Sequence, residues 1–181
     1  MSQFEEKQLE REEIFDGVVL HVVKDKVLLP DGNTSYREFC LHKGAVAVIP
    51  ITENNEAILV RQFRYAHHRE FLEIPAGKFD FIGEDPLAAA KRELEEETGA
   101  RAGKYTYLGV LDTTPALIDE KIHMYLAEDL TFGEMHLDED EFLSVQKFPM
   151  TKLIDMVMSG EIRDSKTQIA ILKAARILGI N

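Results

Sequence analysis

The chain has 181 residues, 45% of them apolar, which suits one domain with a buried core. Its 33 acidic and 21 basic residues give a formal net charge of −12, which argues against binding to nucleic acid or to an anionic membrane. No run of about 18 apolar residues occurs, so we expect no membrane-spanning helix.

The first 43 residues are expected to form a short leader and then a small antiparallel sheet. The polar, acidic residues 1–13 lack the basic and then apolar layout of a signal peptide. Apolar, β-branched segments predict strands at 17–23, 26–29 and 36–41, with a turn at Asp31-Gly32-Asn33. A sheet this small is unstable alone, so it must pack on the main body or on a second subunit.

The single cysteine, Cys40, lies in the apolar run Phe39-Cys40-Leu41 and cannot form an internal disulfide. A small buried hydrophobe is the favoured interpretation, and a reactive thiol is the alternative. Either role suits a reducing cytoplasm.

Residues 44–181 are expected to form the main domain. Apolar runs predict a buried hairpin at 45–51 and 57–60, and further strands at 71–74, 105–111, 122–127 and 142–148. Helices are predicted at 86–97, 151–159 and 164–178, the first with Asp85 as N-cap and Gly99 as its stop. Helices on both faces of a sheet predict an α/β/α sandwich.

The helix predicted at 86–97 carries three acids on one side. At about 100° per residue, Glu93, Glu96 and Glu97 fall within an arc of roughly 100°. Their arc lies beside the apolar stripe that faces the core, formed by Leu87, Ala90 and Leu94. Clustered carboxylates repel each other unless a cation binds them, and hard oxygen ligands suit Mg²⁺. An ordinary solvated acidic face is the alternative.

The context favours the metal site. A glycine-rich loop precedes this helix, and glycine lets the backbone approach a ligand closely. Arg92 lies within the acidic patch, where it can orient Glu84 or a phosphate.

This segment resembles the Nudix box, whose pattern is glycine, five residues, glutamate, seven residues, and then Arg-Glu-apolar-any-Glu-Glu-any-Gly-apolar. Glu84, seven residues, and Arg92-Glu93-Leu94-Glu95-Glu96-Glu97-Thr98-Gly99-Ala100 match this pattern. Gly77 departs from it, because it lies seven positions before Glu84 instead of six. The extra residue precedes the helix and leaves its glutamates in register.

The resemblance implies a Nudix fold with a mixed sheet over about residues 44–148. It also implies that Glu93, Glu96, Glu97 and the Ala76 carbonyl bind Mg²⁺ or Mn²⁺, which would neutralise a pyrophosphate and activate water.

Three flanking features are similar to the ADP-ribose pyrophosphatase subfamily. Arg61-Gln62-Phe63-Arg64, followed by Glu73-Ile74-Pro75-Ala76-Gly77, implies that Arg61, Arg64 and Glu73 bind substrate or support the metal shell. Pro115 lies where the subfamily carries a proline marker, although the usual glycine after it is missing. The N-terminal segment resembles a part that similar enzymes exchange between two subunits. There Phe15 or Tyr36 would stack adenine, unless these aromatics belong to the core.

The acidic loop 137–141 resembles the place where the subfamily supplies an extra glutamate. Glu139 is the first choice for this base and Glu141 the second, with a solvated loop as the alternative. The resemblance therefore predicts a homodimeric enzyme that cleaves a nucleoside diphosphate sugar, ADP-ribose first of all. Another nucleoside diphosphate substrate and a Nudix-fold sensor without turnover remain the alternatives.

Overall fold

The computed structural model describes residues 2–137 and 141–180. The chain divides into two compact units, Met1–Lys43 with Asp112–Lys121 and Gly44–Leu111 with Ile122–Asn181. No helix in the described part of the chain is long and apolar enough to cross a membrane.

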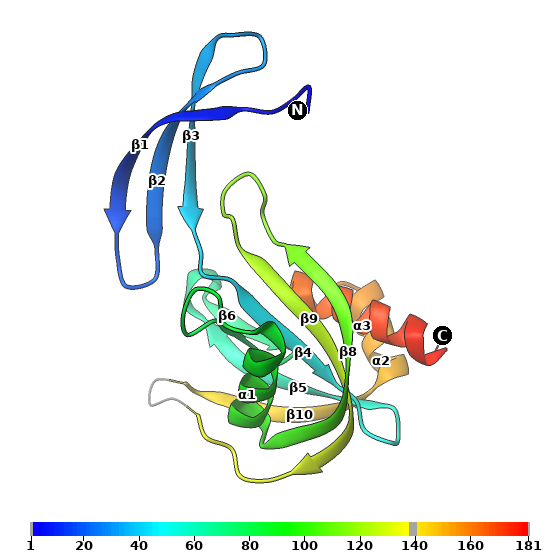
Figure 1. Cartoon of the computed structure of the whole chain (residues 1–181). Helices are drawn as coiled ribbons and strands as arrows, with labels where there is room; N and C mark the ends of the chain where they lie inside the picture. The colour runs from blue at the N-terminus through cyan, green and yellow to red at the C-terminus, as the bar shows by residue number, and fades with distance from the viewer. Residues whose placement is uncertain (1, 138–140, 181) are drawn as a thin grey trace. The chain divides into compact units, whose positions relative to one another are not determined.

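The first unit contains an antiparallel sheet of three strands in the order β1-β2-β3 (Figure 1). The strands are β1 (Lys7–Asp16), β2 (His21–Leu28) and β3 (Thr34–Leu41). The expectation of a polar leader was wrong for most of its length, because β1 occupies it. Every residue of β1 is exposed, so its pairing depends on cross-strand charges instead of apolar alternation. Arg11 pairs with Asp25 at 2.7 Å and Lys26 with Glu10 at 3.7 Å.

The apolar residues 17–20 form a turn and not the expected start of a strand. The Gly17 N–H donates to the Leu20 carbonyl at 2.9 Å, which closes the connection between β1 and β2. The two strands predicted beyond it are one continuous strand, β2, whose Val23 and Val27 are buried.

The loop that contains Pro115 belongs to the first unit by its contacts. Its backbone continues β3 through bonds from the Cys40 N–H to the Leu117 carbonyl at 2.8 Å and from the Asp119 N–H to the Cys40 carbonyl at 3.2 Å. The Asp119 carboxylate also accepts from the His42 N–H at 2.7 Å. Cys40 itself is a free, partly buried cysteine.

The second unit contains two sheets, with strand orders β10-β5-β6 and β7-β4-β9-β8. Its strands are β4 (Ala45–Pro50), β5 (Glu56–Arg64), β6 (Arg69–Glu73), β7 (Ala76–Lys78), β8 (Ala100–Asp112), β9 (Lys121–Phe132) and β10 (Leu143–Pro149). Its helices are the short 3-10 helix η1 (Tyr65–His67), α1 (Pro86–Thr98), α2 (Met150–Met158) and α3 (Ser165–Leu178). The second sheet is mixed, because β4 is antiparallel to β7 and parallel to β9.

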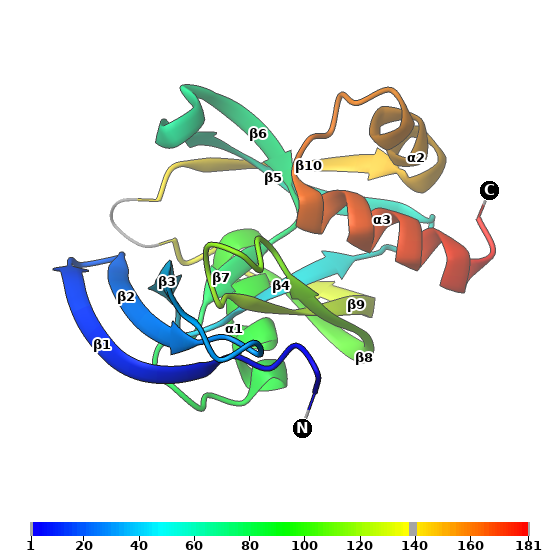
Figure 2. The same ribbon diagram turned by 90° about the horizontal axis from the view of Figure 1, so that it is seen from above.

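Strand β4 forms the middle layer of this unit. Alternate residues of a strand point to opposite faces. Accordingly Ala47 and Ile49 belong to the core with α2 and α3, whereas Val46 and Val48 pack with Ala90 and Leu94 of α1. The helices therefore cover opposite faces (Figures 1 and 2), and the predicted α/β/α sandwich is confirmed.

Two details of the expected fold were wrong. The predicted hairpin of β4 and β5 opens after a single bridge between Ile51 and Ala57, and the two strands enter different sheets. Residues 76–78, expected as loop, form the edge strand β7 against β4. Both differences depend on long-range pairing, which local apolar patterns do not encode.

Candidate active site

Helix α1 supplies the acids of the candidate site. It begins and ends at the residues predicted from the sequence, Asp85 and Gly99. The Asp85 carboxylate accepts from the Ala88 N–H at 2.8 Å, as an N-cap does. Gly99 ends the helix in the left-handed conformation at φ 66°. Leu94 on the inner face is fully buried, so the adjoining carboxylates lie between the core and the surface.

Two of the three acids lie against strand β7. A Cβ atom placed on Gly77 would come within 2.1–2.2 Å of the Glu93 carboxyl group, so any side chain at this position would displace that carboxyl group from β7. The Ala76 N–H donates to Glu97 at 3.3 Å. Glu93 and Glu97 are only 8% and 2% exposed, so they are not members of a solvated acidic face. The third acid, Glu96, is more accessible.

Arg92 lies at the centre of an acidic cluster that consists of Glu84, Glu93, Glu96 and Glu97. Its Nη1 donates to Glu93 at 2.7 Å and to Glu96 at 3.0 Å, and its Nη2 donates to the Lys78 carbonyl at 3.3 Å. Glu84 is 3.6 Å from the same guanidinium and accepts from the Asp80 N–H at 2.8 Å. Arg92 thus connects the loop after β7 to the helix.

The buried carboxylates have strongly perturbed acidities. Burial, together with the charges of Glu93 and Glu141, raises the pKa of Glu97 to about 8. Burial likewise raises the pKa of Glu93 to about 7, although Arg92 opposes that change. The cluster therefore has more buried negative charge than its protein partners compensate.

A divalent cation fits this donor set. The oxygens are hard ligands, two of the three carboxylates are buried, and the absence of a side chain at Gly77 lets the Glu93 carboxyl group lie against β7. In the part of the chain that the structure describes, no three His, Cys, Asp or Glu side chains are already arranged around one metal position. Glu93 and Glu96 instead pair with Arg92, so a bound cation would compete with that arginine.

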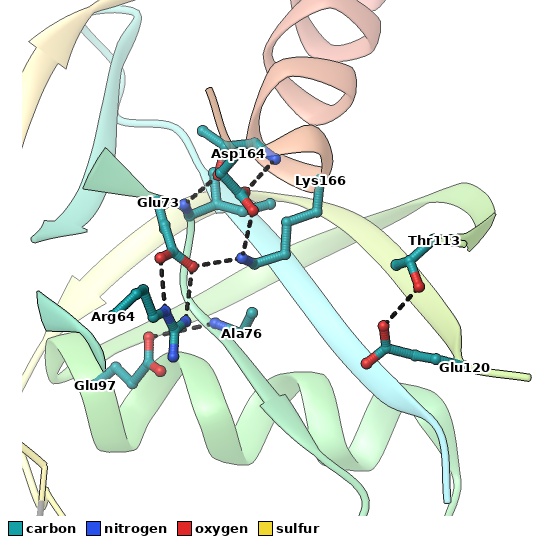
Figure 3. Close-up of polar contacts among 10 residues, drawn as sticks. Arg64, Glu73, Ala76, Glu97, Thr113, Glu120, Asp164 and Lys166 are labelled. Atoms are coloured by element: carbon teal, nitrogen blue, oxygen red, sulfur yellow. Dashed lines mark hydrogen bonds and ion pairs between the residues drawn. The ribbon is translucent and has the colours of Figure 1, made fainter. Parts of the chain in front are cut away.

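Arg64 lies beside the acidic cluster at the end of β5. Its Nε and Nη2 donate to the two oxygens of Glu73 at 2.8 and 2.7 Å, a bidentate pair. Glu73 is 2% exposed and also accepts from Lys166 at 2.5 Å, and Lys166 donates to Asp164 at 3.1 Å (Figure 3). Burial opposes the charge of Glu73, but Arg64 and Lys166 outweigh it and lower its pKa to about 2.

A pocket of 360 Å³ adjoins this network. Its lining combines two cations, two carboxylates and three rings: Arg64, Tyr65, Ala66, His67, Phe71, Glu73, Asp164 and Lys166. The guanidinium of Arg64 lies between Glu73 and Glu97 in Figure 3. The hydrogen bond with Glu73 raises the pKa of Arg64, and the charge of Glu97 acts in the same direction. Arg64 therefore borders both the pocket and the acidic cluster.

The loop after β9 brings one expected acid near the cluster. Glu139, the first choice for the base, lies outside the described residues. The charge of Glu141 raises the pKa of both Glu93 and Glu97, so its carboxylate lies within electrostatic reach of them. The loop is attached to α1 by the His136 N–H, which donates to the Glu96 carbonyl at 3.0 Å.

The remaining expected substrate residues lie elsewhere. Arg61 is 3.9 Å from Glu70 on the neighbouring strand and does not line the pocket. Phe15 and Tyr36 belong to the first unit and are 56% and 58% exposed, so the alternative that they are core residues was wrong for a single chain. Lys24 covers the Tyr36 ring at 4.9 Å.

Lys166 and Asp164 were missed by sequence reasoning. They lie 93 and 91 residues after Glu73 in the chain, and only the fold brings α3 to the end of β6. A usable signal was present in Asp164-Ser165-Lys166-Thr167, where a helix cap is followed by a charged residue on the inner side of the first turn.

Comparisons with known proteins identify the family of this chain. The family model described as NUDIX domain matches residues 41–167. The chain belongs to the Nudix family. It is 43% identical over 173 residues to a Bacillus subtilis (strain 168) protein named ADP-ribose pyrophosphatase, which covers 94% of this chain and 93% of that protein.

Further relatives carry the same name or a different one. A Bacillus methanolicus protein named methanol dehydrogenase activator is 44% identical over 170 residues, 93% of this chain and 91% of its own. A Mycobacterium tuberculosis (strain ATCC 25618 / H37Rv) protein named ADP-ribose pyrophosphatase is 33% identical, over 91% of this chain and 81% of that protein. A crystal structure titled ADP compounds hydrolase shares the Nudix fold at a TM-score of 0.86. The sequence identity is 23%, and the alignment covers 99% of this chain and 97% of the chain in that structure.

Proposed function

We propose that this Nudix pyrophosphohydrolase cleaves the pyrophosphate bond of a nucleoside diphosphate sugar, and that ADP-ribose, yielding AMP and ribose 5-phosphate, is its substrate. Two relatives that match over most of the chain are named ADP-ribose pyrophosphatase, at 43% and 33% identity. The observation that carries the proposal is the buried pair Glu93 and Glu97 with Arg64 at its border. Acids that attract a cation and an arginine that attracts phosphate then lie side by side.

Magnesium, with manganese as an alternative, is the proposed metal. Glu93, Glu96, Glu97 and the Ala76 carbonyl would hold it. When bound, it supplies charge neutralisation for the diphosphate and an acidified water. Mg²⁺ suits this set because all the donors are hard oxygens.

The protein's own groups have separate roles in this proposal. Arg64, held at a fixed angle by Glu73, binds a diphosphate oxygen and orients the substrate. Arg92 keeps Glu84, Glu93 and Glu96 together before the metal and substrate arrive. The attacking water gives its proton to a loop carboxylate, Glu139 first and Glu141 second, which must come within about 3 Å of that water.

The test is a substrate panel with Mg²⁺, scored for AMP release. Purified protein would be incubated with ADP-ribose, ADP-glucose, GDP-mannose and a dinucleotide, each with Mg²⁺ and with chelator. We expect the highest kcat/KM with ADP-ribose and no turnover with chelator. A higher kcat/KM with another compound would contradict the substrate assignment.

One competing substrate class has a specific observation in its favour. A Citrobacter koseri (strain ATCC BAA-895 / CDC 4225-83 / SGSC4696) protein named GDP-mannose pyrophosphatase is 31% identical over 71% of this chain. Preferential GMP release from GDP-mannose in the same panel would favour that class. A ligand sensor without turnover has no such support, because all three box acids are present.

We also propose that the enzyme is a homodimer formed through the N-terminal sheet, with Phe15 and Tyr36 available to stack adenine. Strand β1 is exposed along its whole length and includes the apolar residues Leu9, Ile14 and Phe15. Exposed apolar side chains on an unpaired edge strand favour association.

A cytoplasmic location suits the free Cys40.

A further inference from the structure

Four charged side chains form a continuous network beside the acidic cluster. Arg64 at the end of β5 pairs with Glu73 at the end of β6, Glu73 pairs with Lys166, and Lys166 pairs with Asp164 at the start of α3. Two members come from the consecutive strands β5 and β6, and the other two come from the start of α3, where Lys166 lies 93 residues after Glu73 (Figure 3). The two acids and the two bases balance in charge.

Helix α3 is attached firmly at this point. The Asp164 carboxylate caps the helix by accepting from the Thr167 N–H at 2.9 Å. The Thr167 hydroxyl in turn accepts from the Ile74 N–H at 2.9 Å, and Thr167 is fully buried. The first turn of α3 and the end of β6 therefore form one rigid support for the ammonium group of Lys166.

Lys166 itself is badly placed to bind substrate. It is 9% exposed, and its Nζ lies 2.5 Å from Glu73 and 3.1 Å from Asp164. Arg64 is more accessible, since 42% of its side chain is exposed. Although Lys166 lines the pocket, its ammonium group is paired with two carboxylates, so we expect it to act on the substrate mainly through Glu73 and Arg64.

We propose that Lys166 is a positioning residue whose ammonium group fixes Glu73 so that Glu73 presents Arg64 to the diphosphate. This inference rests on the proposed function and adds a residue to it. Without Lys166, the fully buried Glu73 has Arg64 as its remaining cation, and the network becomes net negative. A net negative network beside the acidic cluster repels the phosphates that Arg64 should attract.

The experiment compares four single variants. Lys166→Met removes the charge with similar length, Lys166→Arg keeps it, and Asp164→Asn removes the partner of Lys166 but keeps a capping side chain. Lys173→Met is the matched control, because Lys173 lies on the same helix and donates to the Leu108 carbonyl at 2.6 Å, away from the pocket.

We expect Lys166→Met to raise KM for ADP-ribose by about 10- to 100-fold, with a smaller change in kcat, because Arg64 contributes mainly to binding. Asp164→Asn should also raise KM, but by less, because Lys166 keeps its charge and its pair with Glu73 and loses only one of its two anchoring carboxylates. Lys166→Arg should restore most of the loss, and Lys173→Met should match the wild type. Adding Lys166→Met to Arg64→Lys should cost much less than it does alone.

A second readout does not depend on turnover. Calorimetric titration with inorganic pyrophosphate should give weaker binding for Lys166→Met than for the wild type and for Lys173→Met. Wild-type protein that binds pyrophosphate but turns over no panel member would contradict the proposed function alone. Unchanged KM and unchanged pyrophosphate binding in folded Lys166→Met, or in Asp164→Asn if Lys166→Met does not fold, would overturn this inference.

Discussion

Glu97 is the residue whose burial differs most from an ordinary helix acid. It is 2% exposed, and its pKa is raised to about 8 by burial and by the neighbouring carboxylates. The charge of such a group is a cost to the folded protein unless a cation compensates it. We therefore propose that an acid at this position serves cation binding and not packing.

Glu97→Gln is the sharpest test at this position. We expect kcat to fall on the order of 1000-fold or more, because a neutral amide holds a divalent cation poorly. The melting temperature of the metal-free protein should stay the same or rise, because the amide has no buried charge. Glu95→Gln is the control, since Glu95 pairs with Arg101 on the outer face. A lower melting temperature with full activity would contradict the assignment.

Glu73 has the opposite property, because its pKa is lowered to about 2 from an ordinary 4.5. A lowered pKa in the folded protein stabilises it above the ordinary value, and this stability is lost as the pH falls from about 4.5 towards 2. The full shift corresponds to on the order of 3 kcal/mol.

Acid unfolding of the wild type and of Glu73→Gln tests this linkage. Denaturant unfolding at a series of pH values should show the wild type losing stability faster than the variant between pH 4.5 and 2. The two curves should run parallel above that window. Parallel curves throughout would mean that Glu73 is not paired as described.

The contact between β7 and α1 makes a prediction at the scale of elements. Gly77→Ala would place a methyl group 2.1–2.2 Å from the Glu93 carboxyl, which must then turn away. Because that carboxyl is the end of a flexible side chain, we expect a small change in melting temperature but a fall in kcat/KM of roughly 10-fold or more. Gly133→Ala, whose added methyl meets nothing closer than 3.8 Å, is the control. Equal activity of both variants would contradict the close approach.

Elements with strong local signals were predicted from sequence. Helix α1 was predicted within one residue of its bounds, because Asp85, Pro86 and Gly99 mark its ends, and the nearly continuous apolar run of β4 predicted a buried strand. Elements that depend on partners distant in sequence were not predicted. Strand β1 is stabilised by ion pairs to β2, and β7 by its pairing with β4, and neither has an apolar pattern of its own.

The same distinction applies to the candidate site. The acids of α1 and Arg92 could be named because one short motif contains them. Lys166 and Asp164 could not, because their nearness to Glu73 arises from the packing of α3 against the end of β6. Burial was also beyond the sequence, since the motif does not reveal that Glu97 is almost inaccessible.

At the scale of the whole molecule, the homodimer is the prediction to test. Phe15→Asp places a charge on the exposed edge strand β1, where Phe15 is 56% exposed. If that strand lies between two subunits, the charge should convert a dimer into a monomer, as measured by light scattering after size exclusion. Met158→Asp, at a side chain that is 75% exposed on α2, is the control. A wild-type protein of monomer mass would contradict the proposal directly.

The path of the chain also limits how the molecule can be taken apart. Residues 112–121 are hydrogen-bonded to the backbone of Cys40 and His42. The chain therefore contributes two separate segments to the N-terminal unit. Removal of the residues before 44 would therefore remove the hydrogen-bond partners of the β8–β9 connection. The Leu117 carbonyl and the Asp119 N–H would then lose their backbone hydrogen bonds to Cys40. A shortened enzyme needs a redesigned turn between β8 and β9 as well as a new start.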